Sequence, residues 1–291
     1  MSSANVVLSL TKRNALLFFR DRSAVFFSFL GAIIILALYI LFLRDNYLGE
    51  MGSNPGATTI VDGWMMAGVV AVTSVTTTGV FLQCMVNDRS TGVVDDFMSS
   101  PTKPMMFTLG YILSTFLIGL LMSLAVMAIA LAYLFSMGAV IPAENILLAV
   151  GVLFPSVLSA SAIMFFLASF IKTEAAYGGF NTIIGTMMGF VTGTYIPVGI
   201  LPGSVQNVVG SLPASHAAMI LRDLFGGDNI NTMFSGDAVA VNEFRDLMGF
   251  NLYVGGFRIE PWMGIAAMLI TWEPTTSTAK EPDQRLPLGF P

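Results

Sequence analysis

The stretch NDRSTGVVDDFMSSPTKP, residues 87–104, separates two apolar runs that are each long enough to cross a lipid bilayer. It holds all of the charged residues between Gly63 and Ala143. A polar segment between two membrane spans lies in water. The stretch therefore predicts an all-α membrane protein whose chain crosses the bilayer and returns through a short, charged loop.

A two-turn helix is predicted inside this loop. Thr91 is suited to be its N-cap, Asp95 and Asp96 lie near the positive end of the helix dipole, and Pro101 ends the helix. An apolar face in water requires a partner, although a solvated loop with chance periodicity is the alternative. The residues at helical spacing that form this face are Val93, Val94, Phe97 and Met98.

The composition excludes a soluble globular domain, because 55% of the 291 residues are hydrophobic and only 11% are charged. The single cysteine, Cys84, excludes a disulfide within the chain. The lone histidine, His216, builds neither a metal cluster nor a catalytic triad. We therefore expect no catalytic residues and no metal site, and hence no enzyme.

Residues 4–20 have one apolar side and a narrow polar stripe that includes Arg13, which is typical of a helix lying in the membrane interface. The twenty apolar residues from Ala24 to Leu43 form the first predicted span. The alternative, a cleaved signal peptide, lacks a convincing cleavage site. Four basic residues precede this span and one arginine follows it, so the N-terminus is predicted to be cytoplasmic.

The remaining spans follow by alternation across the membrane. The segment from Arg44 to Asp62 is expected to be an outer loop, and the segment from Leu201 to Glu260 a long outer region with short re-entrant or interfacial helices. A last apolar run, Pro261–Trp272, points back inward. The other predicted spans are Gly63–Val86, Met105–Met137, Ile146–Ile171 and Ala175–Ile200.

The apolar cores of these five spans contain no ionisable side chain, which argues against a transporter driven by a proton gradient. Neutral polar residues are frequent in the second and fifth spans. They either line a transport pathway or serve helix packing. The candidate pathway residues are Thr73, Thr76, Thr77, Gln83, Asn181, Thr182 and Thr186.

The charged loop resembles the signature of the type-2 ABC exporter permeases, an acidic-Arg-x-x-Gly stretch followed by Thr-Leu-Glu, a few apolar residues and Ser-Pro. Val93 and Val94 stand where threonine and leucine are usual. The prolines after the fifth span, with Arg222 behind them, resemble the same family, as does the N-terminal helix. The resemblance covers roughly residues 5–272. The loop positions that match or substitute conservatively are Asp88, Arg89, Gly92, Asp95, Ser100 and Pro101.

The resemblance implies six spans, a dimer with a second permease copy or paralogue, and a separate ABC ATPase subunit that pushes on the charged loop. The chain itself would bind no cofactor, and ATP and Mg would act through the partner; membrane lipid is an expected partner and nucleic acid is not. Pro197, Pro202 and Pro213 would form an outer gate. The implied ATPase-coupling residues are Asp88, Arg89, Gly92, Val93, Asp95, Asp96, Phe97 and Pro101.

The sixth span departs from the family, because the apolar run ends after twelve residues and Glu273 follows. Twelve helical residues cover about 18 Å, well short of a bilayer. Either the span is incomplete or the tail is foreign to the original reading frame, and we favour the second. The expected organisation is therefore an N-terminal segment at 1–22, a permease domain at 23–272 and a polar tail at 273–291.

Together these features predict the permease subunit of an ATP-driven exporter in a cell membrane, expected to be a prokaryotic plasma membrane. Its neutral pathway favours a hydrophobic drug or antibiotic as substrate, or else a lipid-linked saccharide. The rival hypotheses are a membrane scaffold or assembly factor that transports nothing and, more weakly, a gradient-driven transporter. The scaffold hypothesis leaves the helix of the charged loop without a use.

Overall fold

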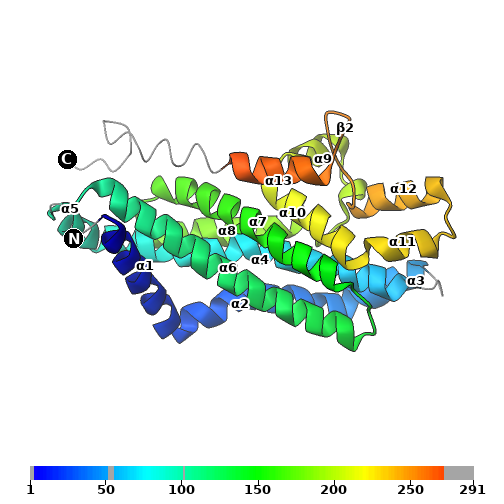
Figure 1. Ribbon diagram of the computed structural model, residues 1–291, viewed down its shortest axis with the longest axis horizontal. Helices are drawn as coiled ribbons and strands as arrows, with labels where there is room; N and C mark the ends of the chain where they lie inside the picture. Colours follow the sequence, from blue (N-terminus) through cyan, green and yellow to red (C-terminus); the bar gives the residue numbers. More distant parts are fainter. Residues whose placement is uncertain (1–2, 52–55, 101, 272–291) are drawn as a thin grey trace.

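The computed structural model describes residues 3–51, 56–100 and 102–271, and most of its helices run along the long axis of the molecule (Figure 1). Four helices among these residues are long and apolar enough to cross a membrane. They confirm the first four predicted spans as helices. Their bounds are Arg22–Gly49, which joins α2 (Arg22–Leu38), the π-helix Tyr39–Leu43 and α3 (Arg44–Met51), then α4 (Ala57–Ser90), α6 (Pro104–Ser136) and α7 (Ala143–Ser169).

The central helix of the bundle is α4, which contacts α2, α6, α7 and α8 (Glu174–Val191). It has 34 residues and is therefore about 51 Å long. Small residues let its neighbours approach closely: a Cβ at Gly79 would collide with the side chain of Asn181 on α8. Burial on nearly all sides explains why α4 lacks the apolar-polar alternation of a surface helix.

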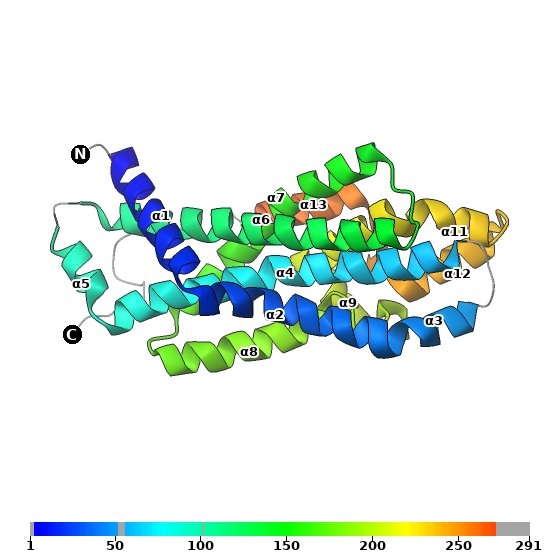
Figure 2. The same ribbon diagram turned by 90° about the horizontal axis from the view of Figure 1, so that it is seen from below.

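Helix α1 (Ser3–Arg20) confirms the predicted N-terminal helix. It crosses the bundle obliquely at the end where α5 (Val93–Met98) lies, and it packs on α6 (Figure 2). Asp21 separates α1 from α2, because its carboxylate accepts hydrogen bonds from the backbone N–H groups of Ser23 and Ala24. The sharp change of direction at residue 21 is thus encoded locally.

Where the structure describes the segment from Arg44 to Asp62, most of it is helical, whereas the sequence predicts a loop. Arg44 begins α3, and Asp62 lies in the second turn of α4, where it is 1% exposed. The Arg44 guanidinium pairs with the Asp62 carboxylate at 2.9 and 3.1 Å. The two charges neutralise each other and let the helices continue past the apolar runs that sequence inspection isolates.

Helix α8 begins within one residue of the predicted fifth span but ends at Val191, nine residues before Ile200. Gly193 has a positive φ of 67°, and Pro197 follows soon after. Both residues are typical helix terminators. The predicted fifth span is therefore too long, and its last third forms turns that lead to the short helices at the opposite end from α5.

These short helices confirm the prediction of short apolar helices after the fifth span. Of them, α10 is almost fully buried against α4, α7 and α13. The strands β1 and β2 form an antiparallel hairpin in which Leu252 pairs with Ile259. The bounds are a 3-10 turn Val198–Ile200, α9 Gly203–Gly210, α10 Pro213–Arg222, the π-helix Asp223–Gly227, α11 Asp228–Met233, α12 Ala238–Met248, β1 Leu252–Val254 and β2 Phe257–Ile259.

The last described helix, α13 (Pro261–Ile270), has ten residues and packs on α7 and α10. It is therefore about 15 Å long, half of a hydrocarbon core. The short apolar run that sequence reasoning identifies is thus a short helix. The predicted polar tail at 273–291 lies outside the described residues.

Candidate coupling site

Helix α5 confirms the helix predicted in the charged loop, but it starts one residue later than expected. Thr91 is not its N-cap: its hydroxyl donates to the Asn87 carbonyl at 2.8 Å and closes the last turn of α4. Gly92, with φ +80°, then reverses the chain and stands at the N-cap position. The left-handed backbone explains why a glycine is needed there.

The apolar face of α5 already has a partner inside the chain. The Phe97 ring stacks on Phe107 of α6, with centroids 5.2 Å apart and planes inclined by 7°. Val93 is half-buried, whereas Asp95 and Asp96 are exposed. The exposed side of α5 is therefore acidic, and the half-buried Val93 lies beside it. This differs from the exposed apolar face that the sequence predicts.

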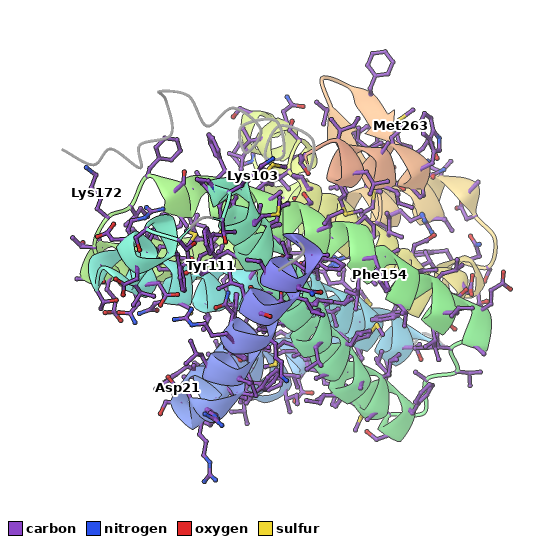
Figure 3. All side chains as sticks on the ribbon, turned by 60° about the vertical axis from the view of Figure 1, so that its left-hand side comes forward. Asp21, Lys103, Tyr111, Phe154, Lys172 and Met263 are labelled. Carbon is purple, nitrogen blue, oxygen red and sulfur yellow. The ribbon has the colours of Figure 1, made fainter. Side chains whose placement is uncertain are left out.

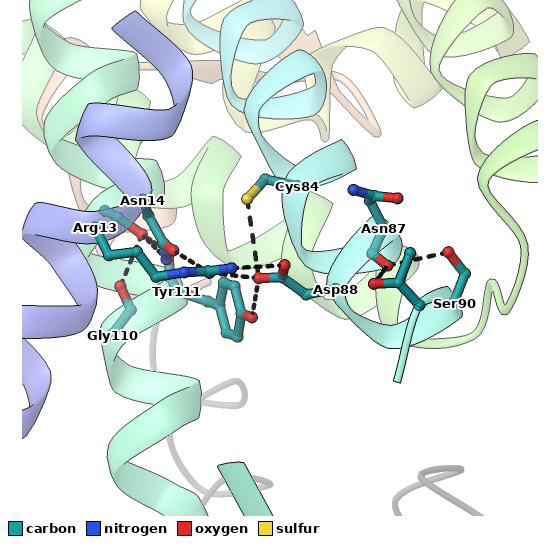
Figure 4. Close-up of polar contacts among 10 residues, drawn as sticks. Arg13, Asn14, Cys84, Asn87, Asp88, Ser90, Gly110 and Tyr111 are labelled. Carbon is teal, nitrogen blue, oxygen red and sulfur yellow. Dashed lines mark hydrogen bonds and ion pairs between the residues drawn. The ribbon is translucent and has the colours of Figure 1, made fainter. Parts of the chain in front are cut away.

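Asp88 lies at the centre of a buried polar cluster (Figure 4). Its carboxylate accepts two hydrogen bonds from the Arg13 guanidinium, at 2.6 and 2.9 Å, and one from the Tyr111 hydroxyl at 2.6 Å. The hydrogen bonds that Arg13 donates to the Asp88 carboxylate raise the pKa of Arg13. Asp88 is only 4% exposed, so it does not lie at the rim of a surface that could contact an ATPase, although the family resemblance implies a coupling role for it.

Arg13 joins three helices at this point. Besides pairing with Asp88 of α4, its guanidinium lies 5.5 Å from the centroid of the Phe97 ring of α5. The neighbouring Asn14 donates to the Ser114 hydroxyl of α6 at 3.2 Å. Helix α1 is thereby fixed to the end of α4, to α5 and to α6, through charge-assisted and aromatic contacts.

Arg89 also points into the protein rather than to a rim. Its guanidinium donates to the backbone carbonyls of Ser169 and Ile171, at 3.0 and 3.2 Å, where α7 ends. A cation at a helix C-terminus satisfies carbonyls that have no partner within the helix. Close to it, Gln83 donates to the Glu174 carboxylate at 3.2 Å. The end of α4 is thus connected to the turn between α7 and α8.

The structure therefore brings most of the predicted coupling residues to one end of the bundle, but it divides the charged ones into an inner pair and an outer pair. Asp88 and Arg89 hold helices together inside the protein, while Asp95 and Asp96 face outward. Pro101 lies outside the described residues. Sequence reasoning missed Tyr111 and Asn14, because their partners are distant in the chain. Figure 3 shows Tyr111 within the bundle and Lys172 at its edge.

The predicted pathway residues divide into two groups. Thr73 and Thr77 are at most 1% exposed, and their hydroxyls donate to backbone carbonyls of α4 itself. Their surroundings are those of helix packing. Thr182 and Thr186 are exposed on one side of α8, and Thr76 is partly exposed beside Gly185 of the same helix. Asn181 is half-buried against α4.

The three prolines predicted as an outer gate each precede or begin a helical element. Pro197 and Pro213 are buried and Pro202 is exposed. A fully buried arginine, Arg222, holds this region together: it donates to the carbonyls of Thr192 and Gly249, at 2.6 and 3.2 Å. The end of α8 and the end of α12 are therefore fixed to α10 through a single guanidinium.

The family model described as ABC-2 type transporter matches residues 5–225, from the start of α1 to the π-helix after α10. No curated protein matches the chain. Among the residues that the structure describes, no group of three or more histidine, cysteine or carboxylate side chains could hold a metal ion.

Proposed function

Because the chain belongs to the ABC-2 type transporter family, we propose that it is the permease subunit of an ATP-driven exporter. It is a multi-pass membrane protein, and the family implies an ABC ATPase as its partner. In this proposal the chain binds no nucleotide. ATP and Mg are bound by the ATPase subunit, which supplies the energy from outside the chain.

The observation that carries the proposal is the junction of α1, α4, α5 and α6. A helix of six residues with two exposed carboxylates projects at one end of the bundle, and its inner side is fixed to three longer helices through Phe97 and Arg13. A force applied to α5 is therefore transmitted to α4, the central helix. The exposed Asp95 and Asp96 would set the register against basic groups of the ATPase.

The pathway is proposed to run along the open side of α8. The Thr182 and Thr186 hydroxyls donate to backbone carbonyls of α8 itself, at 2.9 Å each, but their oxygens keep acceptor capacity that hydrocarbon cannot satisfy and that a protein interface or an aqueous passage can. The exposed Thr182 and Thr186 therefore argue for a second permease, a copy or a paralogue, on this side. A neutral pathway suits a hydrophobic drug or antibiotic, or a lipid-linked saccharide.

The orientation is part of the same proposal. The α5 end carries the basic N-terminal residues, so it is assigned to the cytoplasm of a prokaryotic cell. The end with α10, α11 and α12 then faces outward. Alternating access would open the pathway toward one end and then toward the other, as the ATPase moves α5.

The test replaces the two residues that shape α5. Gly92→Pro forces φ to about −65° where the chain has +80°, and Phe97→Asp removes the ring that stacks on Phe107. Each variant is purified with the ABC ATPase encoded beside it and reconstituted into vesicles. We expect insertion to be retained but co-purification of the ATPase, or its coupling to efflux, to be lost.

The matched control is Phe97→Leu, which keeps an apolar side chain and should preserve coupling. Normal efflux and normal ATPase binding in both disruptive variants would refute the coupling role of α5. The absence of any ABC ATPase gene beside this one, together with a failure to bind such an ATPase, would favour the membrane scaffold.

A further inference from the structure

An apolar cavity of about 250 Å³ lies between α7 and α8, next to the start of α10. Its floor is Val75 on the central helix α4. It is separate from the junction at α5 and from the exposed hydroxyls of α8. The lining residues are Val75, Ser156, Ser159, Ala160, Ile163, Met164, Leu167, Ile184, Met187, Met188, Val191, Leu212, Pro213 and Ala214.

The side chains that line the cavity need no hydrogen bond from a ligand. Its two serines are already paired: the Ser156 hydroxyl bonds that of Ser74 at 2.9 Å, and the Ser159 hydroxyl bonds that of Thr271 at 2.6 Å. None of the described residues that line the cavity is charged. Three methionines do, and their flexible thioether side chains adapt to irregular apolar shapes. The cavity is therefore suited to a hydrocarbon.

The cavity opens on the exposed surface of the bundle and reaches inward to the central helix. Met187 at its mouth is 53% exposed, whereas Val75 at its floor is 8% exposed. Helix α13 ends at the rim, where Thr271 meets Ser159.

We propose that this cavity binds one acyl chain of a membrane lipid. Lipid chains surround a membrane-spanning bundle in place of water. If the apolar cavity were empty, its lining atoms would have no dispersion contacts on the side that faces the cavity. The transported molecule is the less suitable occupant, because three of the four α8 residues that line the cavity face away from Thr182 and Thr186, and only Met187 reaches the exposed side. Ile184 and Met188 are each two residues from Thr182 and Thr186, about 200° around the helix, so they face the opposite way.

The test uses the whole chain in nanodiscs of phosphatidylcholine, a small fraction of which carries a diazirine midway along one acyl chain. After irradiation, the labelled residues are located by peptide mass spectrometry. A chain inside the cavity labels Val75, which lipid on the outer surface of the protein does not reach. Labelling confined to exposed residues such as Met187 and Ile183 would overturn the proposal.

Ala160→Phe places a ring in the cavity, and Gly31→Phe places the same ring on an open surface of α2, where nothing lies within 4 Å. We expect Ala160→Phe to reduce labelling of Val75 by about tenfold, the effect of one tenfold loss in affinity. Gly31→Phe should leave it unchanged. Undiminished labelling in a folded Ala160→Phe variant would also overturn the proposal. If that variant does not fold, the wild-type labelling pattern decides. Neither result depends on the ATPase.

Discussion

The two ends of α4 carry the same chemical arrangement and put it to different uses. Each end has a buried aspartate that accepts hydrogen bonds from one arginine and from tyrosine. Asp62 pairs with Arg44 and Tyr39, and Asp88 pairs with Arg13 and Tyr111. The two carboxylates are 26 residues apart, or about 39 Å along the helix, so they flank a hydrocarbon core of about 30 Å.

The difference lies in where each arginine comes from. Arg44 belongs to the helix that directly precedes α4, so its ion pair links neighbours in sequence. Arg13 belongs to α1, 75 residues before Asp88, and it also contacts Phe97 of α5. The Asp62 cluster anchors two consecutive helices. The Asp88 cluster connects α5, which the ATPase moves in the proposed mechanism, to α1 and α4. In the proposed mechanism, the ion pair at Asp62 is an anchor, and the ion pair at Asp88 is a transmission that passes movement of α5 to α4.

The largest effect is expected from removing either carboxylate. Asp62→Ala and Asp88→Ala each remove a buried carboxylate and leave a partly exposed arginine without its partner, which costs at most about 3–5 kcal/mol of stability, the value for a fully buried pair. Thermal unfolding of the purified chain should show similar losses for both. Only Asp88→Ala should also abolish ATPase coupling in the reconstituted complex. Equal loss of coupling in the two variants would contradict the distinction between anchor and transmission.

A charge exchange sharpens this comparison. Asp88→Arg alone places two cations in one buried site, and combining it with Arg13→Asp restores an opposite pair. We expect the double variant to recover ATPase co-purification that the single variant loses. Failure to recover it, with a folded double variant, would mean that the contact of Arg13 with Phe97 matters more than its charge.

The tyrosines are expected to contribute less. Tyr111→Phe and Tyr39→Phe each remove one hydrogen bond to a carboxylate and leave the arginine in place. A hydrogen bond to a charged group contributes about 1.5–3 kcal/mol. Both variants should therefore lower the unfolding temperature less than the alanine variants, and by similar amounts. A loss as large as that of Asp88→Ala would show that Tyr111, not Arg13, is the main partner.

Phe97→Ala should act locally. It removes the stacking on Phe107 and the contact with Arg13, each worth about 0.5–1.5 kcal/mol. Hydrogen exchange of α5 and of the start of α6 should accelerate, while exchange at the Asp62 end of α4 should not. Unchanged protection in α5 would show that the helix is held by other contacts.

The sequence predicts elements that depend on local patterns and misses contacts between distant segments. Apolar runs define α2, α4, α6 and α7, and the spacing of Val93, Val94 and Phe97 predicts α5. The burial of Asp88 could not be predicted, because it depends on Arg13 and Tyr111 in other helices. Likewise, the sequence predicts that Asp62 lies in a loop, because its ion pair with Arg44 cannot be read from the sequence. Charged residues were assigned to water because a single sequence does not reveal ion pairs.

The smallest effect is expected from Cys84→Ser. The Cys84 thiol lies 4.0 Å from the Asp88 carboxylate, a weak contact that a serine hydroxyl can replace. Stability should change by no more than about 0.5 kcal/mol. The thermal unfolding curve and ATPase co-purification should both match the wild type. A large loss of stability would show that the thiol is a necessary part of the polar cluster around Asp88.

The Cys84→Ser variant contains no cysteine, so single cysteines added to it can show which end of the molecule faces the cytoplasm. Ser99 lies just after α5 and Thr232 lies in α11, at opposite ends of the molecule, and both are exposed (Figure 1). In the Cys84→Ser background, Ser99→Cys should react with an impermeant maleimide only after the cells are opened, whereas Thr232→Cys should react in intact cells. The reverse pattern would place α5 outside, away from any cytoplasmic ATPase, and would turn the transmission at Asp88 into a second anchor. Reaction of both from one side would contradict the crossing of the membrane by α4.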